Sequence, residues 1–437
     1  MKEQSPQAHA PEAEPSRRVF LKTGPVLATS LAATLAVPAL PGRAQTSSGA
    51  RWCATWGAAP AGPPPAASIQ TYSSQTLRLI VRTSIGGSRV RIRISNEMGS
   101  VPLRIGRATI ALRSSGAAVV QSSVRELRFG GAPSVTIRAR APAVSDALDF
   151  VVPAQADLAI SLYLYGTTEG TTLHNAALQH SYVSPGGDYT STVSMPVTRT
   201  LTCWPFLTAV DVQAAVPCLV ALGDSITDGQ GSPINTNRRW PDYLARRLQA
   251  SLGAAGRIGV VNRGISGNFL LYDTPNGLLA GYAAPERFDR DVLSTSGVRY
   301  LVTLIGTNDV RAMSSTNPVP ASDLIAGYRQ LIMRAQARDI TIIGATLPPF
   351  EGFSTYGPVQ EGVRRAVNDW MRASGEFDAL LDTDAALRDP ARPTRLLPAY
   401  DSGDHLHPND AGYQAIANAV PLAPFLSGAT VPVEQSG

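Results

Sequence analysis

The chain has 437 residues, more than one hydrophobic core usually serves, so the sequence predicts two or three domains. Hydrophobic residues make up 44% and charged residues 16%, a balance that excludes a disordered polyampholyte. The 38 glycines and 34 prolines indicate many turns, which favours β-rich architecture and excludes a coiled coil.

The net charge of +5 is unevenly distributed along the chain. Residues 45–210 hold 14 Arg against 7 acidic residues, a net charge of +7, whereas residues 211–437 hold 19 Arg against 23 acidic residues, a net charge of −4. No basic helix and no mixed aromatic and basic motif accompanies the positive half. A nucleic-acid partner is therefore not expected.

The first 44 residues have the pattern of an export signal. Arg17 and Arg18 precede a mildly apolar stretch, and small residues end it at Ala44. This resembles a twin-arginine signal peptide cleaved after Ala44, which implies export in the folded state to the periplasm or beyond the cell. The alternative is an uncleaved anchor, but Gly24 and Pro25 interrupt the stretch and a membrane span needs roughly 20 apolar residues. The mature chain is expected to have no stable membrane insertion.

Within the predicted first domain, residues 45–210, the stretch from about residue 70 to 165 carries the period-two alternation of strands with one wet face. In the run from Arg89 to Ile94, arginines alternate with Val90, Ile92 and Ile94. Similar runs at residues 77–81 and 158–164 are separated from it by segments rich in Gly, Pro and Ser. The pattern predicts a β-sandwich, jelly-roll-like domain of about 150 residues.

The arginines of this region suggest a hypothesis about partners. Arg89, Arg91 and Arg93 share the wet face, and residues 78–113 hold eight Arg against one acidic residue. Such a field could attract an anionic polysaccharide or cell surface. The alternative is an ordinary solvated face, on which arginine stems cover the apolar strand surface.

The three cysteines, Cys53, Cys203 and Cys218, allow at most one disulfide within a chain. An oxidising compartment permits that bridge without requiring it. Their spacing matches no zinc pattern, and one of the five histidines lies in the leader, so neither a metal nor another cofactor is expected.

The pattern changes near Asp211, where we place the boundary to a second domain, residues 211–437. Continuous apolar strands are predicted at residues 218–222, 258–261, 300–305, 340–345 and 380–381, and amphipathic helices at 240–252, 322–338, 359–373 and 410–426. This alternation predicts a parallel α/β sheet with helices on both faces. Active sites in such sheets lie beyond the carboxyl ends of the strands.

Four short motifs lie at these strand ends or just before the last helix. Gly-Asp-Ser at residues 223–225 follows the first strand, residues 262–268 follow the second, and residues 306–309 follow the third. The fourth motif, Asp-His-Leu-His at residues 404–407, precedes the last helix. All four can converge on one edge of the sheet, although Gly-Asp-Ser alone could be an ordinary helix cap.

The residue types of these motifs suit an activated serine. Ser225 is the candidate nucleophile, and its hydroxyl needs a base, for which histidine, with an ordinary pKa of about 6.5, is suited near neutrality. His407 is the candidate base, and Asp404, three residues earlier, can orient its imidazole. His405 is the rival base, but its spacing from Asp404 is too tight for the same contact. We expect His405 to pack or to be solvated.

As an ordered set, the four motifs resemble the SGNH hydrolase superfamily, the GDSL esterases and lipases, over residues 211 to about 426. The resemblance implies a flavodoxin-like parallel sheet, no cofactor, and a base on the histidine before Pro408. It also implies an oxyanion hole formed by the backbone N–H groups of Ser225 and Gly267 and the side-chain amide of Asn308. Ordinary turns are the alternative for Gly267 and Asn308.

The remaining polar residues of the motifs are expected to be structural. Asp224, Asp228 and Asp309 are interpreted as residues that hold loops and transfer no proton. His174 and His180, in the first domain, could reach the catalytic rim, but a polar surface role is the favoured interpretation.

Two loops near the predicted rim hold an unusual share of the aromatic residues. They could form a platform for a sugar, an acyl or aryl pocket, or a small satellite core, and the sequence leaves these three open. The residues are Phe269, Tyr272, Tyr282, Phe350, Phe353 and Tyr356.

A leader, a sandwich and then a serine-hydrolase domain together resemble the secreted carbohydrate-esterase-like members of this superfamily. The expected function is an exported serine esterase that removes short acyl groups, with acetyl favoured, from a carbohydrate or a similar ester. A lipase or aryl esterase with the same site is the alternative, followed by an acyltransferase. The alternative from a different functional class is a polysaccharide-binding surface protein whose hydrolase domain has lost its activity.

Overall fold

The computed structural model describes residues 51–273, 278–314 and 318–427. The predicted leader, residues 1–44, lies outside the described residues. Within the described ranges, no helix combines the length and the apolar character that crossing a membrane requires.

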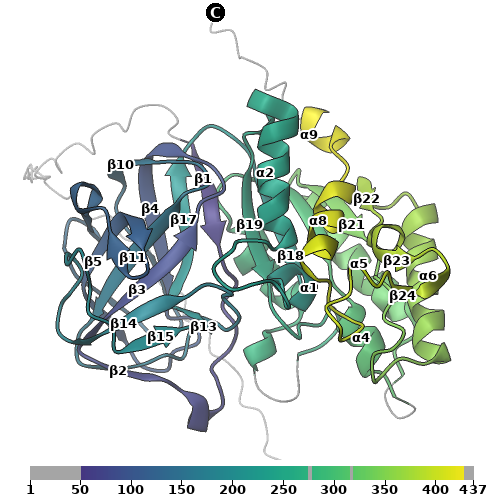
Figure 1. The fold of residues 1–437 in the computed structure, drawn as a ribbon, viewed down its shortest axis with the longest axis horizontal. Coiled ribbons are helices and arrows are strands. Elements are labelled where there is room, and N and C mark those ends of the chain that lie inside the picture. The colour runs from purple at the N-terminus through teal and green to yellow at the C-terminus, as the bar shows by residue number, and fades with distance from the viewer. Residues whose placement is uncertain (1–50, 274–277, 315–317, 428–437) are drawn as a thin grey trace, which may run out of the picture. The chain divides into compact units, whose positions relative to one another are not determined.

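The first half of the described chain is antiparallel and β-rich (Figure 1). Its five-stranded sheet has the order β1-β17-β4-β10, with β9 also paired to β4. The members are β1 (Trp52–Gly57), β17 (Leu207–Gln213), β4 (Gly87–Ser95), β10 (Leu148–Val152) and β9 (Pro142–Val144).

The second antiparallel sheet has eight strands in the order β15-β14-β3-β11-β5-β6, with β7 and β8 also paired to β5. Its members are β15 (Arg199–Leu201), β14 (Ser181–Gly186), β3 (Gln75–Arg82), β11 (Asp157–Leu164), β5 (Leu103–Ser115), β6 (Ala118–Val119), β7 (Arg125–Leu127) and β8 (Val135–Ile137). Two short pairs complete this region: β2 (Thr71–Ser73) with β12 (Thr167–Glu169), and β13 (Leu173–His174) with β16 (Trp204–Pro205).

The alternation in β4 produces two different faces. Val90, Ile92 and Ile94 are buried in the hydrophobic core, as the period-two pattern predicts. The three arginines of the opposite face are each paired rather than free: Arg89 with Asp149, Arg91 with Asp211 at 3.0 Å, and Arg93 with the Ser294 hydroxyl at 2.9 Å.

The second half is a parallel sheet in the order β19-β18-β20-β21-β22 (Figure 1). Its strands are β18 (Cys218–Gly223), β19 (Gly259–Gly264), β20 (Val298–Leu304), β21 (Thr341–Ala345) and β22 (Ala379–Leu381). All five predicted strands are present, within one to three residues at each end. Asp211, where we placed the domain boundary, lies inside β17, and the antiparallel order gives way to the parallel one between β17 and β18.

Helices cover both faces of the parallel sheet. Successive side chains of β18 point to opposite sides, and because they are apolar, both faces of the sheet are buried. Leu219 and Ala221 share a core with α2 (Trp240–Leu252) and α8 (Asp410–Ala419). Val220 and Leu222 belong to the larger core, which includes α5 (Ala321–Gln336), α6 (Pro358–Ala373) and the antiparallel sheets.

The C-terminal helix differs from its prediction. The sequence predicted one helix over residues 410–426, but α8 ends at Ala419 and a separate helix, α9, spans Ala423–Ser427. Pro421 explains the interruption, because proline lacks a backbone N–H and disfavours a helical conformation in the preceding residue.

Several short elements were not predicted. They are the helices α1 (Ser225–Asp228), α3 (Ala284–Phe288), α4 (Thr307–Ala312) and α7 (Thr383–Leu387), the π-helical turn Asp289–Leu293, the 3-10 turns Ala66–Ser68, Gln121–Ser123, Gly253–Gly256 and Leu278–Ala280, and the hairpin of β23 (Arg388–Asp389) and β24 (Arg392–Leu396). Cys53, Cys203 and Cys218 are all buried free thiols, so the single disulfide that the cysteine count allowed is not formed.

Candidate active site

Ser225 opens the one-turn helix α1 directly after β18. Asp224 caps this helix, because its Oδ1 accepts a hydrogen bond from the Ile226 N–H at 3.0 Å. A side chain at Gly223 would overlap the Leu304 carbonyl of β20, so glycine lets the strand turn sharply at this point. The turn leaves Ser225 8% exposed at the carboxyl edge of the parallel sheet.

The fourth motif brings His407 and Asp404 to this serine. The Ser225 Oγ lies 2.8 Å from His407 Nε2, and His407 Nδ1 lies 2.5 Å from Asp404 Oδ2. The Asp404 Oδ1 accepts hydrogen bonds from the backbone N–H groups of Leu406 and His407, at 2.9 and 2.8 Å. Ser225, His407 and Asp404, the candidate nucleophile, base and orienting carboxylate, thus form one continuous hydrogen-bonded chain.

The carboxyl group of Asp404 is held ionised in this arrangement. Its partial burial opposes the charged form, but the His407 side chain and the two backbone N–H groups outweigh that effect and lower the pKa of Asp404 to about 2. A carboxylate that stays charged near neutrality can keep the Nδ1 proton of the imidazole and so leave Nε2 free to accept from serine.

His405 is turned away from Ser225 and paired elsewhere. Its Nδ1 lies 2.6 Å from Asp401 Oδ2, and its side chain is 53% exposed. The residue has a φ of 65°, and its ring packs against the backbone at Gly352. His405 is therefore both packed and partly solvated, as expected.

Asn308 lies in the first turn of α4, the helix that follows β20. Its Nδ2 donates to the Asn268 carbonyl at 2.8 Å, and its Oδ1 accepts from Arg311 Nε at 2.6 Å. Two partners thus fix the amide plane, and among the described residues the second N–H of the amide has no partner. Gly267, next to Asn268, has a φ of +81°, a conformation that glycine adopts without strain.

Asp228 and Asp309 hold the loop that carries Gly267. The Asp228 Oδ2 accepts from the Ser266 N–H at 2.9 Å and from the Ser266 hydroxyl at 2.7 Å. The Asp309 carboxylate accepts from the backbone N–H groups of Leu270 and Leu271, both at 2.9 Å. These contacts agree with the loop-holding role expected for the two aspartates.

Burial raises the pKa of two carboxyl groups beside the serine. The pKa of Asp224 rises to about 7, and that of Asp309 rises to about 6, chiefly because both side chains are removed from water. The Asp224 Oδ2 is buried and has no hydrogen-bond partner among the described residues, which fits a carboxyl group whose pKa is raised by burial.

The expectation of a polar surface role is wrong for His174. This residue of β13 is only 4% exposed, and its Nε2 lies 2.9 Å from Asp228 Oδ1. Its Nδ1 lies 3.0 Å from the Ala59 carbonyl. Burial lowers the pKa of His174, but the charge of Asp228 and the hydrogen bonds to Asp228 and Ala59 outweigh that effect, so the pKa is raised overall.

His180 takes the partly exposed, polar position that was expected. Its backbone N–H donates to Asn235 Oδ1 at 2.7 Å, and its Nδ1 lies 3.1 Å from Asn235 Nδ2. His174 gave no stronger signal than His180 in the sequence, since each is a lone histidine beside polar residues.

Arg287 is a residue of the site region that the sequence analysis missed. Fully buried on α3, it donates at 2.9 Å to the carbonyl of Gly223, the last residue of β18, and at 2.7 Å to the carbonyl of Arg263, the next-to-last residue of β19. It also donates to Asn268 Oδ1 at 3.0 Å and to Asp291 at 2.9 Å. The guanidinium therefore ties the two strand ends to the loop that carries Gly267.

The aromatic residues near the rim pack mainly against the protein. Phe269 and Phe350 are buried, whereas Tyr272, Phe353 and Tyr356 are partly buried against the main core. Phe269 and Tyr272 lie 4.6 Å apart between ring centroids, and the Arg311 guanidinium lies 5.7 Å from the Phe353 ring. The satellite-core interpretation thus holds for the two buried rings, and the part-buried rings remain candidates for substrate contact.

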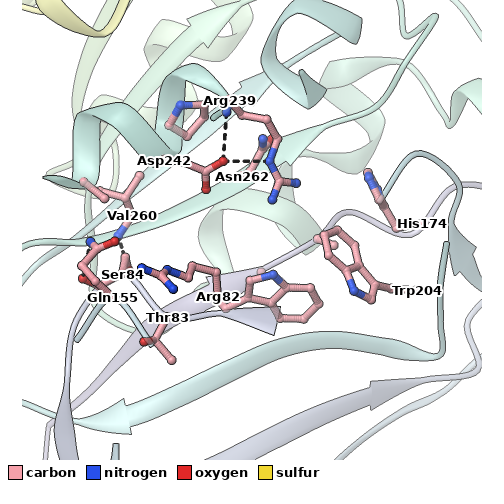
Figure 2. Close-up of a pocket in the computed structure, with 15 residues that line it drawn as sticks. Arg82, Thr83, Ser84, Gln155, His174, Trp204, Arg239, Asp242, Val260 and Asn262 are labelled. Atoms are coloured by element: carbon pink, nitrogen blue, oxygen red, sulfur yellow. Dashed lines mark hydrogen bonds and ion pairs between the residues drawn. The ribbon is translucent and has the colours of Figure 1, made fainter. Parts of the chain in front are cut away.

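A small cavity lies next to His174, away from Ser225. Figure 2 shows His174 and Trp204 at the right of it, Arg239 with its partner Asp242 above, and Arg82 and Ser84 below and to the left. Its volume of about 30 Å³ is far below the roughly 300–1,000 Å³ of small-molecule sites. Among the described residues, no cluster of three or more His, Cys, Asp or Glu could hold a metal ion.

The family model of the GDSL-like lipases and acylhydrolases matches residues 221–415. These residues are a GDSL-type acylhydrolase domain. The GDSL domain makes the protein a carboxylic ester hydrolase, and it confirms the resemblance seen in the four motifs.

Several solved structures are similar to the chain, and each of the following three covers less than half of it. They include a G-D-S-L family protein from Desulfitobacterium hafniense DCB-2 (23% identity, 46% of this chain and 96% of that one, TM-score 0.35). An α/β hydrolase from the metagenome of Lake Arreo, Spain, has 26% identity over 48% of this chain and 96% of that one, with a TM-score of 0.35. An acetylxylan esterase from Geobacillus stearothermophilus has 24% identity over 48% and 94%, with a TM-score of 0.36. No curated protein matches the chain.

Proposed function

We propose that this protein is an exported serine esterase that hydrolyses short acyl esters, with acetyl favoured, on a carbohydrate. The observation that carries the serine mechanism is the hydrogen-bonded chain from Ser225 Oγ through His407 to Asp404, with distances of 2.8 and 2.5 Å. Each member is of the residue type that its role requires, and no further group is needed to activate the hydroxyl.

The first half-reaction acylates the enzyme. His407 Nε2 takes the Ser225 proton as Oγ attacks the ester carbonyl, and the Asp404 carboxylate stabilises the imidazolium that forms. Collapse of the tetrahedral intermediate breaks the bond to the alcohol, and His407 returns the proton to the leaving oxygen. The acyl group then remains as an ester on Ser225.

The second half-reaction uses water in place of the alcohol. His407 removes a proton from the water, whose oxygen attacks the acyl carbonyl, and the carboxylic acid leaves as Ser225 recovers its hydrogen. In both half-reactions the negative oxygen is stabilised by the N–H groups of Ser225 and Gly267 and by the free N–H of Asn308. Support for this assignment comes from the two contacts that fix the Asn308 amide.

A flavodoxin-like arrangement of the parallel sheet and a sandwich arrangement of the two antiparallel sheets complete the proposal. The strand order β19-β18-β20-β21-β22, second-first-third-fourth-fifth along the chain, supports the former. The core shared by β3, β4, β11 and β17 supports the latter. The twin-arginine motif of residues 17–18 supports export to the periplasm or beyond the cell.

Contact of the antiparallel region with an anionic polysaccharide stays a prediction. It is weakened because Arg89 and Arg91 already form ion pairs with Asp149 and Asp211. Among the described residues, the guanidinium of Arg93 donates only to the neutral Ser294, so its charge remains uncompensated there. A lipase or aryl esterase and an acyltransferase share the same chemistry, whereas a binding protein with a spent hydrolase domain does not need the intact hydrogen-bonded chain.

Two measurements test the proposal. Stoichiometric labelling of Ser225 by a serine-directed phosphonate, absent in Ser225→Ala, would separate an active hydrolase from a spent one. Hydrolysis rates on p-nitrophenyl esters from acetate to palmitate, and on acetylated glycans, would then show which acyl chain length the enzyme prefers. A maximum rate at octanoate or longer, with no acetate release from the glycans, would overturn the short-acyl carbohydrate assignment in favour of a lipase.

A further inference from the structure

We propose that His174, from the antiparallel region, is a positioning residue of the hydrolase: it orients Asp228 and thereby fixes the loop that presents the Gly267 N–H to the oxyanion. The inference rests on the proposed function, in which that N–H is an oxyanion donor. It makes the antiparallel region a working part of the active site.

The argument starts with Asp228, which lies at the end of the same helical turn that Ser225 begins. Its carboxylate is fully occupied: Oδ2 accepts both hydrogen bonds from Ser266, and Oδ1 lies 2.9 Å from His174 Nε2. Ser266 directly precedes Gly267, so a change in the direction of this carboxylate is passed to the Gly267 backbone.

His174 is itself held in one orientation. Its Nδ1 lies 3.0 Å from the Ala59 carbonyl, which also belongs to the antiparallel region, and its ring lies 5.5 Å from that of Trp204 at a tilt of 31°. The guanidinium of Arg239, at the start of α2, lies over the Trp204 ring, 5.6 Å from the ring centroid. Side chains from both halves therefore surround the imidazole that contacts Asp228. Figure 2 shows His174, Trp204 and Arg239 lining the same cavity.

The chemistry of the pair favours a charged contact. Asp228 and Arg239 are the charged groups that face His174, and its two ring nitrogens both lie against acceptors, Asp228 Oδ1 and the Ala59 carbonyl. An imidazole that donates from both nitrogens is the protonated form. A charge-assisted hydrogen bond is shorter and stronger than a neutral one, and it holds the carboxylate direction more tightly.

The neighbouring cavity does not offer another role for His174. With a volume of about 30 Å³ it holds a water or two and no sugar or acyl group. Ser225, His407 and Asn308 are not among its lining residues. The imidazole therefore acts through its hydrogen bond to Asp228.

The test compares His174→Phe and His174→Gln with wild type on p-nitrophenyl acetate. The phenylalanine ring cannot donate to Asp228, so kcat should fall about 10- to 100-fold, because a displacement near 1 Å costs up to about 10² in rate, while KM stays within about twofold. The glutamine amide can donate to Asp228 and should recover kcat to within about fivefold of wild type. Inactivation by a serine-directed phosphonate should slow in parallel with kcat.

Ser266→Ala gives a second route that does not depend on a buried substitution. It removes the hydroxyl donor to Asp228 and should lower kcat by about 3- to 10-fold. Combined with His174→Phe, its effect should be less than multiplicative, because both changes act through the same carboxylate. The matched control is His180→Gln, which alters the other histidine of the antiparallel region that contacts the GDSL half, through Asn235, and should leave kcat unchanged.

Two results would overturn the proposal. One is a folded His174→Phe with kcat within twofold of wild type, and the other is an equal loss of kcat in the Phe and Gln variants, which would assign His174 a packing role only. If His174→Phe does not fold, an unchanged kcat in Ser266→Ala is decisive against it. Turnover retained by Ser225→Ala in the same assay would instead refute the proposed function.

Discussion

The substitution Asn308→Ala separates a catalytic contribution from a structural one in a single side chain. In the structure the amide makes two hydrogen bonds, Nδ2 to the Asn268 carbonyl at 2.8 Å and Oδ1 from Arg311 Nε at 2.6 Å. Removing both costs about 1 kcal/mol each, so the free energy of unfolding should fall by about 2 kcal/mol and Tm by roughly 2 to 4 °C.

The catalytic contribution of the same amide is larger. Its remaining N–H is assigned to the oxyanion, and loss of one such donor lowers kcat by about 10² to 10³, which corresponds to about 3 to 4 kcal/mol of transition-state stabilisation. KM should change much less, since the charge develops mainly in the transition state. The assay is steady-state hydrolysis of p-nitrophenyl acetate together with thermal unfolding followed by circular dichroism.

A matched control is Asn262→Ala, at the end of β19. Asn262 also makes two hydrogen bonds, Nδ2 to the Thr227 carbonyl at 2.6 Å and Oδ1 from the Gly264 N–H at 2.8 Å, but it has no assigned contact with substrate. It should lose a similar Tm and retain kcat to within about threefold. The reasoning fails if Asn308→Ala loses stability while its kcat stays at the wild-type value.

Three further outcomes are expected. Ser225→Ala should reduce turnover below about a hundredth of wild type with Tm unchanged within about 2 °C, since the hydroxyl is the covalent participant; higher residual activity would exclude Ser225 as the nucleophile. His407→Ala should lose about 10³ or more in kcat while His405→Ala stays within about threefold, and the reverse result would show that the base was misassigned. Because the pKa of His174 is raised in the folded protein, its stabilising contact with Asp228 is fully present below the unfolded pKa of about 6.5 and is lost as pH rises through the higher folded value. The Tm difference between wild type and His174→Gln should therefore shrink as the pH is raised from 6 into the alkaline range, and a difference that grows with pH would contradict this.

The sequence was most informative about the parallel half. The strands there are continuous apolar runs, and α2 begins and ends where its amphipathic pattern does, at Trp240 and Leu252. The candidate triad could be named because chemistry-bearing residues follow strands whose carboxyl ends must meet at one edge. His407 could be preferred over His405 because a carboxylate three residues earlier reaches an imidazole that one residue earlier does not.

Local pattern was insufficient for the short elements. A helix of one turn such as α1 has no periodicity to detect, and its existence depends on the Asp224 cap and on the turn that Gly223 allows beside β20. The break between α8 and α9 was visible in principle, since Pro421 stands inside the predicted helix.

The tertiary structure alone decided which polar residues are buried. A buried charge is tolerated only where other segments bring partners to it, so nothing in the local sequence distinguishes Arg287, with its four acceptors, from a surface arginine. The same holds for His174, whose partner Asp228 lies 54 residues away in the other half of the chain. The sequence by itself determined which side chains are candidates for acyl-transfer chemistry, because that chemistry needs particular functional groups at strand ends. Only tertiary packing, both within the GDSL domain and between it and the antiparallel sheets, determined which residues hold those groups in place.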